Sequence, residues 1–444
     1  MQTRLTFKYL LTPEGLRRDQ TLVVDGNGVI EALTPAMGPA DGFLAIPGMP
    51  NAHSHAFQRA LSGFGEQRKG SDTFWSWREA MYRLAGRITP EDMLVVARQA
   101  FLEMLRGGFT SVAEFHYLHH LPDGRPGPEM ARAVVQAAAE TGIRLRLLPV
   151  FYQSGGFNQP AGPEQRRFVH ATIEDYCRLL QELHGVPLGV APHSLRAVNP
   201  ENLRRLIEVA EQEYGERLPI HIHISEQQLE VEECRKLYGM TPVELLSKTV
   251  QLNPRWNLVH ATHASEAERR LLAQRAVTVV LCPVTEAYLG DGLFAADEFK
   301  DAGGRLAIGS DSNCRIDAIE ELRWLEYGQR LRKQQRARFA DAKGLGQCLW
   351  SGICTGGAAA VAQPVGAIAA GKYADLVVLD EQAGPWLGHG IDTLMDALII
   401  GGSRNDIAAV YVGGKRLVDH GESNGAQAAA DAFARVTASL NKPS

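Results

Sequence analysis

Two His-x-His pairs lie far apart in the chain, at residues 53–55 and 221–223. In a strand, residues i and i+2 point to the same side, so both imidazoles of a pair could reach one ion. Imidazole nitrogens suit zinc or iron, and a carboxylate can complete such a site. Asp311, in Gly309-Ser-Asp-Ser, is placed to supply it. The pattern therefore predicts a metal site formed by His53, His55, His223 and Asp311.

Three imidazoles and one carboxylate leave one position open to water, as a catalytic metal site requires. A bound divalent ion lowers the pKa of that water towards ~7 and so supplies hydroxide at neutral pH. Zinc is the expected ion, and the same ligands would serve iron or manganese. His221 should share the face of His223 one layer deeper, where we expect a hydrogen-bonded core histidine and not a ligand.

Two further residues have types and positions suited to proton transfer. Glu226 follows His223 by three residues, where its carboxylate could take a proton from water and return it to a leaving nitrogen. The alternative for Glu226 is a surface ion pair. His260 ends a later apolar run and could polarise the substrate, a role for which His263 competes. The residues expected to transfer protons or polarise the substrate are therefore Glu226 and His260.

Residues so far apart need a fold that brings them together. The middle of the chain alternates apolar, strand-like runs with amphipathic helical stretches, as parallel βαβ units do. Eight runs read as buried strands, at residues 44–46, 111–115, 145–151, 188–191, 219–224, 257–260, 277–281 and 306–309. Eight repeats predict a (β/α)₈ TIM-like barrel, whose active site lies at the carboxyl ends of the strands. A doubly wound open sheet is the alternative, but no G-x-G-x-x-G follows the first strand.

Strand-rich segments flank this region. Residues 22–33 predict a hairpin around Asp25-Gly-Asn-Gly, and residues 407–418 predict another around Gly413-Gly414. Residues 374–380 read as a further strand. We therefore expect an α/β protein in which residues 1–46 and 365–444 form a small β-sandwich domain from both termini and residues 47–364 form the barrel.

Composition narrows the functional class. The formal net charge of −5 and the absence of a basic domain argue against nucleic-acid binding. No run reaches the ~18 apolar residues of a membrane helix, and the first residues form no apolar signal core. The six cysteines form no C-x-x-C pair. We expect a cytoplasmic protein with reduced thiols that binds neither nucleic acid nor membrane.

The order of these motifs resembles that of the amidohydrolase superfamily, with matching segments at residues 47–55, 221–226, 259–260, 309–312 and 364–380. Binuclear members carry a carboxylated lysine at the end of strand four, whereas this strand ends in Ala191-Pro-His-Ser. The resemblance is therefore to the mononuclear deaminase branch. It implies one divalent ion per subunit, expected to be Zn²⁺, on the four ligands named above, and a homodimer.

Within that branch, residues 52–63, 73–79 and 310–331 resemble the formimidoylglutamate deiminase family. This resemblance implies hydrolysis of N-formimino-L-glutamate to N-formyl-L-glutamate and ammonia, a step of histidine degradation. It places Glu226, His260 and Asp311 around the reacting carbon. It also implies substrate contacts from Gln58, Arg78, Tyr117, His193 and Arg196.

A small substrate with two carboxylates requires two donor-rich clamps, and arginine binds carboxylates bidentately. Arg78 and Arg196 could supply them. Either could instead be a surface arginine, Arg78 packed beside the neighbouring tryptophans. Gln58 and Tyr117 could simply line the barrel.

Two other functions stay open. One is another mononuclear deaminase acting on a purine, pterin or triazine, which would need amide donors and aromatic stacking. The other is a metal-free, non-catalytic binding protein on the same fold. The segment Gly65–Ser71 is a candidate for a loop that closes over the substrate.

Overall fold

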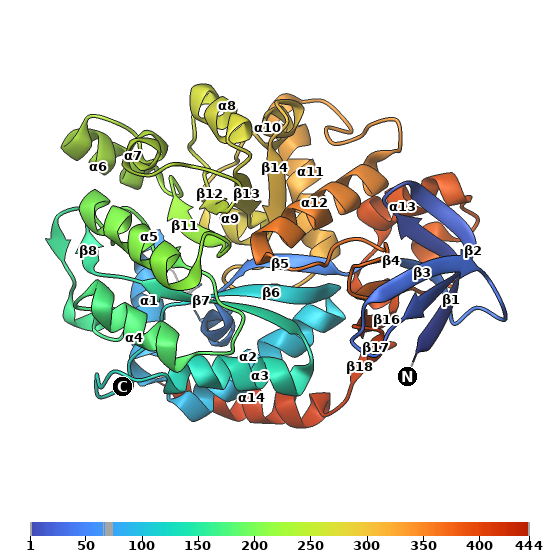
Figure 1. Ribbon diagram of the computed structural model, residues 1–444, viewed down its shortest axis with the longest axis horizontal. Helices are drawn as coiled ribbons and strands as arrows, with labels where there is room; N and C mark the ends of the chain where they lie inside the picture. The colour runs from blue at the N-terminus through green and yellow to red at the C-terminus, as the bar shows by residue number, and fades with distance from the viewer. Residues whose placement is uncertain (1, 65, 67–73, 443–444) are drawn as a thin grey trace.

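The computed structural model describes residues 2–64, 66 and 74–442 (Figure 1). Apart from Glu66, the candidate closing loop Gly65–Ser71 lies outside these described residues. Within the described ranges, no helix combines the length and apolarity needed to cross a membrane.

Parallel strands form a curled sheet that closes into a barrel (Figure 1). The first half contains β5 (Met49–Ser54), β6 (Phe109–His116), β7 (Arg144–Phe151) and β10 (Ala191–Pro192). The second half contains β11 (Ile220–Ile224), β12 (Trp256–His260), β13 (Thr278–Leu281) and β14 (Arg305–Ile308). Parallel bridges join the halves at both seams, Val190 to Ile220 and Ser54 to Asp311. The predicted barrel is therefore confirmed.

Helices surround this barrel (Figure 1). They are α2 (Pro90–Arg106), α3 (Glu129–Thr141), α4 (Ile173–Glu182), α5 (Pro200–Tyr214), α6 (Gln228–Tyr238), α7 (Pro242–Thr249), α8 (Glu266–Gln274), α10 (Ala296–Asp301), α11 (Ala318–Lys333) and α12 (Leu345–Val361). Several begin with a capping box, in which a Ser or Thr accepts from the N3 amide and an acidic N3 side chain accepts in return. The N-cap residues of these capping boxes are Thr89, Thr172, Thr241 and Ser265.

Shorter elements fill the carboxyl end of the barrel and its loops. They are η1 (Ala56–Leu61), α1 (Phe74–Arg87), β8 (Ser154–Gly156), β9 (Gln159–Pro160), η2 (Pro163–Gln165) and α9 (Pro283–Leu289). Of these, η1, α1 and α9 carry side chains of the candidate site.

The two ends of the chain share one separate sheet beside the barrel (Figure 1). Its strands are β1 (Thr3–Thr12), β2 (Gly15–Val24), β3 (Ile30–Pro35), β4 (Gly42–Pro47), β15 (Leu376–Leu379), β16 (Ile407–Val412), β17 (Lys415–Asp419) and β18 (Glu422–Ser423). β4 pairs in parallel with β1 and antiparallel with β15, which joins the two ends of the chain. The hairpins predicted at 22–33 and 407–418 are confirmed.

The remaining C-terminal elements are η3 (Gly384–Trp386), η4 (Ile391–Thr393), α13 (Leu394–Gly401), η5 (Arg404–Asp406) and α14 (Ala426–Leu440). α14 packs against α2, on the outside of the barrel (Figure 1). Its C-cap Asn441 donates to the Ala60 carbonyl at 3.0 Å. The last helix, α14, is therefore attached to the barrel at α2 and η1.

The expectation that residues 44–46 form the first barrel strand is wrong. These residues lie in β4 of the terminal sheet, and β5 is the first barrel strand. Both runs are buried along their lengths, so neither shows the alternation that would assign it to a sheet. Gly48 separates them, and a Cβ there would lie 2.2 Å from Thr110 Oγ1, so the chain changes sheets where only glycine fits.

Candidate active site

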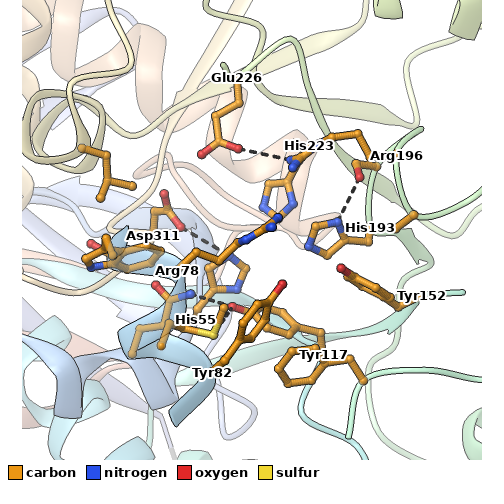
Figure 2. Close-up of a pocket in the computed structure, with 18 of the residues that line it drawn as sticks. His55, Arg78, Tyr82, Tyr117, Tyr152, His193, Arg196, His223, Glu226 and Asp311 are labelled. Atoms are coloured by element: carbon orange, nitrogen blue, oxygen red, sulfur yellow. Dashed lines mark hydrogen bonds and ion pairs between the residues drawn. The ribbon is translucent and has the colours of Figure 1, made fainter. Parts of the chain in front are cut away.

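The three predicted histidine ligands form one cluster of close metal-binding atoms, and Asp311 lies beside it in a second cluster with His260 and Cys282. Figure 2 shows His55, His223 and Asp311 at this end of the barrel. His53 Nε2 lies 3.2 Å from His55 Nε2 and 3.0 Å from His223 Nε2. Asp311 Oδ1 lies 3.3 Å from His55 Nε2 and 3.6 Å from His53 Nε2. Ligands about 2.0–2.1 Å from a tetrahedral zinc ion lie about 3.3–3.4 Å from one another. The observed separations fit that spacing.

The protonation of the imidazoles agrees with metal binding. His55 Nδ1 donates to the Phe115 carbonyl at 2.8 Å, which leaves a lone pair on Nε2. Burial lowers the pKa of His55 to about 3 and lowers the pKa values of His53 and His223 well below their usual range. Neutral rings whose Nε2 atoms converge at 3.0–3.2 Å are placed to bind one cation together. The residues present therefore suit one divalent metal ion.

Close contact between β5 and the end of β14 holds His53 and Asp311 together. The His55 amide donates to the Asp311 carbonyl at 2.9 Å, and the Asp311 amide donates to the His53 carbonyl at 3.0 Å. Gly309 permits this approach, because a Cβ there would lie 2.6 Å from the His53 carbonyl oxygen. Asp311 has a φ of +43°, a strained value for a residue other than glycine.

Two buried asparagines also join β5 to the segment that follows β14. Asn51 Nδ2 donates to Ser310 Oγ at 2.7 Å, and Asn313 Nδ2 donates to the His55 carbonyl at 3.0 Å. These hydrogen bonds fix the directions in which the ligand side chains leave their strands.

The proposed proton-transfer groups surround the metal ligands. His260 Nε2 lies 3.8 Å from both Glu226 Oε1 and Asp311 Oδ2. Burial by itself would lower the pKa of His260, but the neighbouring carboxylates Glu226, Glu286 and Asp311 raise it to about 10. Burial raises the pKa of Asp311 to about 7 against the opposing effect of His260. A bound cation would favour the ionised form of Asp311.

A pocket of about 700 Å³, mouth included, opens over this cluster (Figure 2). Its lining contains all five predicted substrate contacts, which are Gln58, Arg78, Tyr117, His193 and Arg196. It also contains Glu226, His260 and Asp311, whereas His263 is not part of the lining. Residues predicted for metal, proton transfer and substrate thus share one cavity.

Each of the five predicted substrate contacts has a side-chain neighbour in the pocket lining. Gln58 Nε2 donates to Tyr117 Oη at 2.6 Å, and His193 Nδ1 lies 3.0 Å from Ser194 Oγ. Arg196 Nη2 lies 3.6 Å from Glu226 Oε2. Arg78 extends from α1, with its guanidinium 5.5 Å from the Tyr82 ring centre. Two cationic groups therefore lie in the same pocket as the metal ligands.

His221 is the buried core histidine that its position predicts. Its Nε2 donates to the Ala360 carbonyl at 2.9 Å. Among the described residues, His221 belongs neither to the cluster of His53, His55 and His223 nor to that of His260, Cys282 and Asp311.

Sequence reasoning missed three residues of the site. Tyr152 directly follows β7, so the strand-end rule that identified the other residues could have found it. Tyr82 lies on α1 four residues after Arg78, on the same helical face. Glu286, on α9, has Oε1 3.2 Å from His260 Nδ1 and carries no sequence signal of that contact.

The chain is similar to known proteins along nearly its whole length. The sequence profile of the amidohydrolase family matches residues 44–417. The chain is 42% identical to formimidoylglutamate deiminase of Pseudomonas aeruginosa, over 97% of this chain and 98% of that protein. It is 29% identical to 5-methylthioadenosine/S-adenosylhomocysteine deaminase of Natronomonas pharaonis, over 94% and 93% of the two chains.

Solved structures show the same likeness. An amidohydrolase from Brucella melitensis superposes with a TM-score of 0.90 at 39% identity, covering 99% of this chain and all of that one. An adenosine deaminase from Xanthomonas campestris with bound zinc superposes with a TM-score of 0.80 at 25% identity, covering 98% of each chain.

Proposed function

The chain belongs to the amidohydrolase family, and we propose that it hydrolyses N-formimino-L-glutamate to N-formyl-L-glutamate and ammonia. The observation that carries this proposal is the presence of Arg78 and Arg196 in one pocket with three converging imidazoles and Asp311. The metal ligands account for hydrolysis of a C–N bond. The two arginines account for a substrate with two carboxylates.

Substrate binding follows from the shapes of the donors. Guanidinium groups bind carboxylates through paired N–H donors. Arg196 Nε is buried and, within the described residues, has no hydrogen-bond partner, so this side chain keeps donor capacity for an anion. We assign one substrate carboxylate to Arg196 and the other to Arg78. Gln58, Tyr117 and His193 then line the space between the arginines and the metal ligands.

We propose zinc as the ion held by His53, His55, His223 and Asp311. All four side chains are buried, and their donor set of imidazoles and one carboxylate suits zinc. When bound, the ion lowers the pKa of a water molecule and polarises the substrate. Metal analysis of the purified protein, with activity restored to stripped protein by zinc, iron or manganese in turn, identifies the native ion.

Glu226 and His260 are the side chains that we assign to proton transfer and charge stabilisation. As the water oxygen bonds to the formimino carbon, Glu226 takes one water proton. Glu226 delivers that proton to the imino nitrogen, which becomes an amino group on a tetrahedral carbon. The proton of the new hydroxyl group then passes through Glu226 to this amino nitrogen, the C–N bond breaks, and ammonia leaves with the electron pair of that bond. His260, 3.8 Å from Glu226, donates towards the developing charge on the attacked group. The carbon keeps the oxygen as the formyl group of the product.

A ring deaminase is the second candidate, favoured by the aromatic side chains of the pocket, Tyr82, Tyr152 and Phe168. Against it stands the shortage of amide donors, since Gln58 alone carries one among the described lining side chains. A metal-free binding protein would not need a complete set of converging ligands.

The decisive assay measures ammonia release from N-formimino-L-glutamate by the zinc-loaded protein, beside a panel of purines, pterins and triazines. Turnover of the formimino compound alone supports the proposal. Turnover of a ring compound alone overturns it and leaves a metal-dependent deaminase. The domain division at residues 46 and 365, the homodimer and the cytoplasmic location stay predictions from the sequence.

A further inference from the structure

His260 uses its two ring nitrogens in different directions. Nδ1 lies 3.2 Å from Glu286 Oε1, whereas Nε2 lies 3.8 Å from Glu226 Oε1 and from Asp311 Oδ2. We propose that Glu286 is a positioning residue, which holds the His260 ring with a proton on Nδ1 and directs Nε2 at the reacting group. This inference rests on the proposed function for the identity of that group.

The chemistry of a carboxylate fixes the direction of this hydrogen bond. An ionised carboxylate only accepts, so the hydrogen between the two side chains belongs to His260 Nδ1. Nε2 is then the nitrogen left to act on the substrate, whether the ring is neutral or charged. With an apolar residue in place of Glu286, either ring nitrogen could carry the proton of the neutral ring, and the ring could rotate.

Glu286 is itself held in place. Its Oε1 also accepts from the Cys282 amide at 2.9 Å, at the point where β13 passes into α9. Only 5% of Glu286 and 1% of His260 is exposed, so water does not compete freely for the bond. The carboxylate therefore presents one defined oxygen to the ring.

The backbone at His260 has an unusual conformation. His260 and Ala261 both have positive φ angles, +69° and +50°, which side chains other than glycine rarely adopt. Such conformations persist where surrounding contacts maintain them. Among the described residues, Glu286 is the hydrogen-bond partner of Nδ1.

Glu321 offers a matched control on the same wall of the barrel. It is fully buried on α11, and its Oε2 accepts from the Val284 amide at 2.9 Å, two residues from the amide that Glu286 holds. No hydrogen bond or ion pair between Glu321 and His260 is found in the described part of the chain. Glu321→Gln therefore reproduces the loss of a buried carboxylate beside α9 without loosening His260.

The kinetic test compares Glu286→Leu, Glu286→Gln and Glu321→Gln in zinc-loaded protein. Loss of a group that orients a metal-ligating histidine typically costs about 10- to 100-fold in activity, and Glu286 would orient His260 in the same way. We expect that fall in kcat for Glu286→Leu, with KM little changed. Glu286→Gln should restore part of the rate, because its carbonyl can still accept from Nδ1 and the Cys282 amide. Glu321→Gln should keep kcat.

A second measurement needs no substrate. In proton NMR, a hydrogen-bonded imidazole N–H gives a downfield signal, which His260→Gln assigns by removing it. The signal should be present in the wild type and in Glu321→Gln and lost in Glu286→Leu. If Glu286→Leu does not fold, the NMR signal of the wild type and the kcat of Glu286→Gln still test whether Glu286 positions His260.

The inference is overturned if Glu286→Leu turns over as fast as Glu321→Gln, or if His260 Nδ1 carries no proton in the wild type. Failure of the proposed function is a separate result. Absence of N-formimino-L-glutamate turnover in the wild type would refute the substrate, while the NMR signal would still judge the role of Glu286.

Discussion

The guanidinium of Arg196 and the carboxylate of Glu226 lie 3.6 Å apart, between Nη2 and Oε2, and only 10% and 9% of the two side chains is exposed. The residue assigned to a substrate carboxylate thus contacts the residue assigned to proton transfer. Substrate position and proton position are coupled through this pair.

Glu226→Gln should remove proton transfer and keep substrate binding. The amide matches the carboxylate in shape but cannot accept the water proton, and such groups contribute about 10²- to 10⁴-fold. We expect kcat to fall by about that factor, while the metal content stays near one ion per chain. Steady-state kinetics with metal analysis of the same sample checks this. Near-normal turnover in a folded, metal-loaded variant would refute the assignment.

Arg196→Gln should weaken substrate binding. Losing a charge-assisted hydrogen bond costs about 1.5–3 kcal/mol, which corresponds to about a 10- to 100-fold loss of affinity. We expect KM to rise by that factor, and kcat to fall as well because Glu226 loses its neighbour. Arg78→Gln should raise KM with a smaller effect on kcat.

Arg275→Gln, at an exposed position outside the pocket lining, is the matched control for both arginine variants. An unchanged KM in Arg196→Gln and Arg78→Gln would show that the substrate carboxylates bind elsewhere.

Gly309→Ala should damage the metal site through packing. The new Cβ would lie 2.6 Å from the His53 carbonyl oxygen and 2.8 Å from its Cβ. Such overpacking costs about 1–3 kcal/mol. Urea unfolding should show that loss, together with reduced metal content. Gly352→Ala, at an exposed position in α12 with open space around it, should instead raise stability by about 0.5–1 kcal/mol. Full metal occupancy in Gly309→Ala would show that the metal site does not depend on the close contact between Gly309 and His53.

Glu114 should make stability fall as pH rises. Burial raises the pKa of its carboxyl from the ordinary 4.5 to about 8, against hydrogen bonds from the Ala56 amide and Ser54. Between these two values the folded protein binds the proton that the unfolded chain releases. Its contribution is therefore complete below about pH 4.5 and is lost as pH approaches 8.

Glu114→Gln should flatten this dependence, because an amide cannot ionise. The free energy of unfolding of metal-loaded protein, measured at about pH 5.5 and pH 8, should differ less in the variant, by an amount on the order of a few kcal/mol. An unchanged pH dependence would show that Glu114 is ionised in the folded state.

Much of this site could be predicted because the fold and the spacing carry the information. Polar residues that end parallel strands must meet at one end of a barrel, so His53, His55, His223 and Asp311 could be combined without a structure. Glu226 and His260 followed from the same rule. The two hairpins at 22–33 and 407–418 followed from their turn residues.

The rest depended on contacts that spacing does not encode. Residues 44–46 and β5 are both continuously buried, and only their hydrogen-bond partners assign them to different sheets. Glu286 lies on a helix, where its burial against His260 depends on how α9 packs. Tyr82 lines the pocket together with Arg78 of the same helix, and its four-residue spacing from Arg78 points to it only once α1 is known to border the pocket.

We propose that one metal-dependent site recognises both carboxylates of a formimino amino acid. The most direct test compares kcat/KM for N-formimino-L-glutamate and N-formimino-L-glutamine, in which an amide replaces the side-chain carboxylate. We predict a loss of about 10- to 100-fold for the glutamine compound, the value of one charge-assisted hydrogen bond. Equal kcat/KM for the two compounds, or faster ammonia release from a purine, pterin or triazine, would contradict the claim.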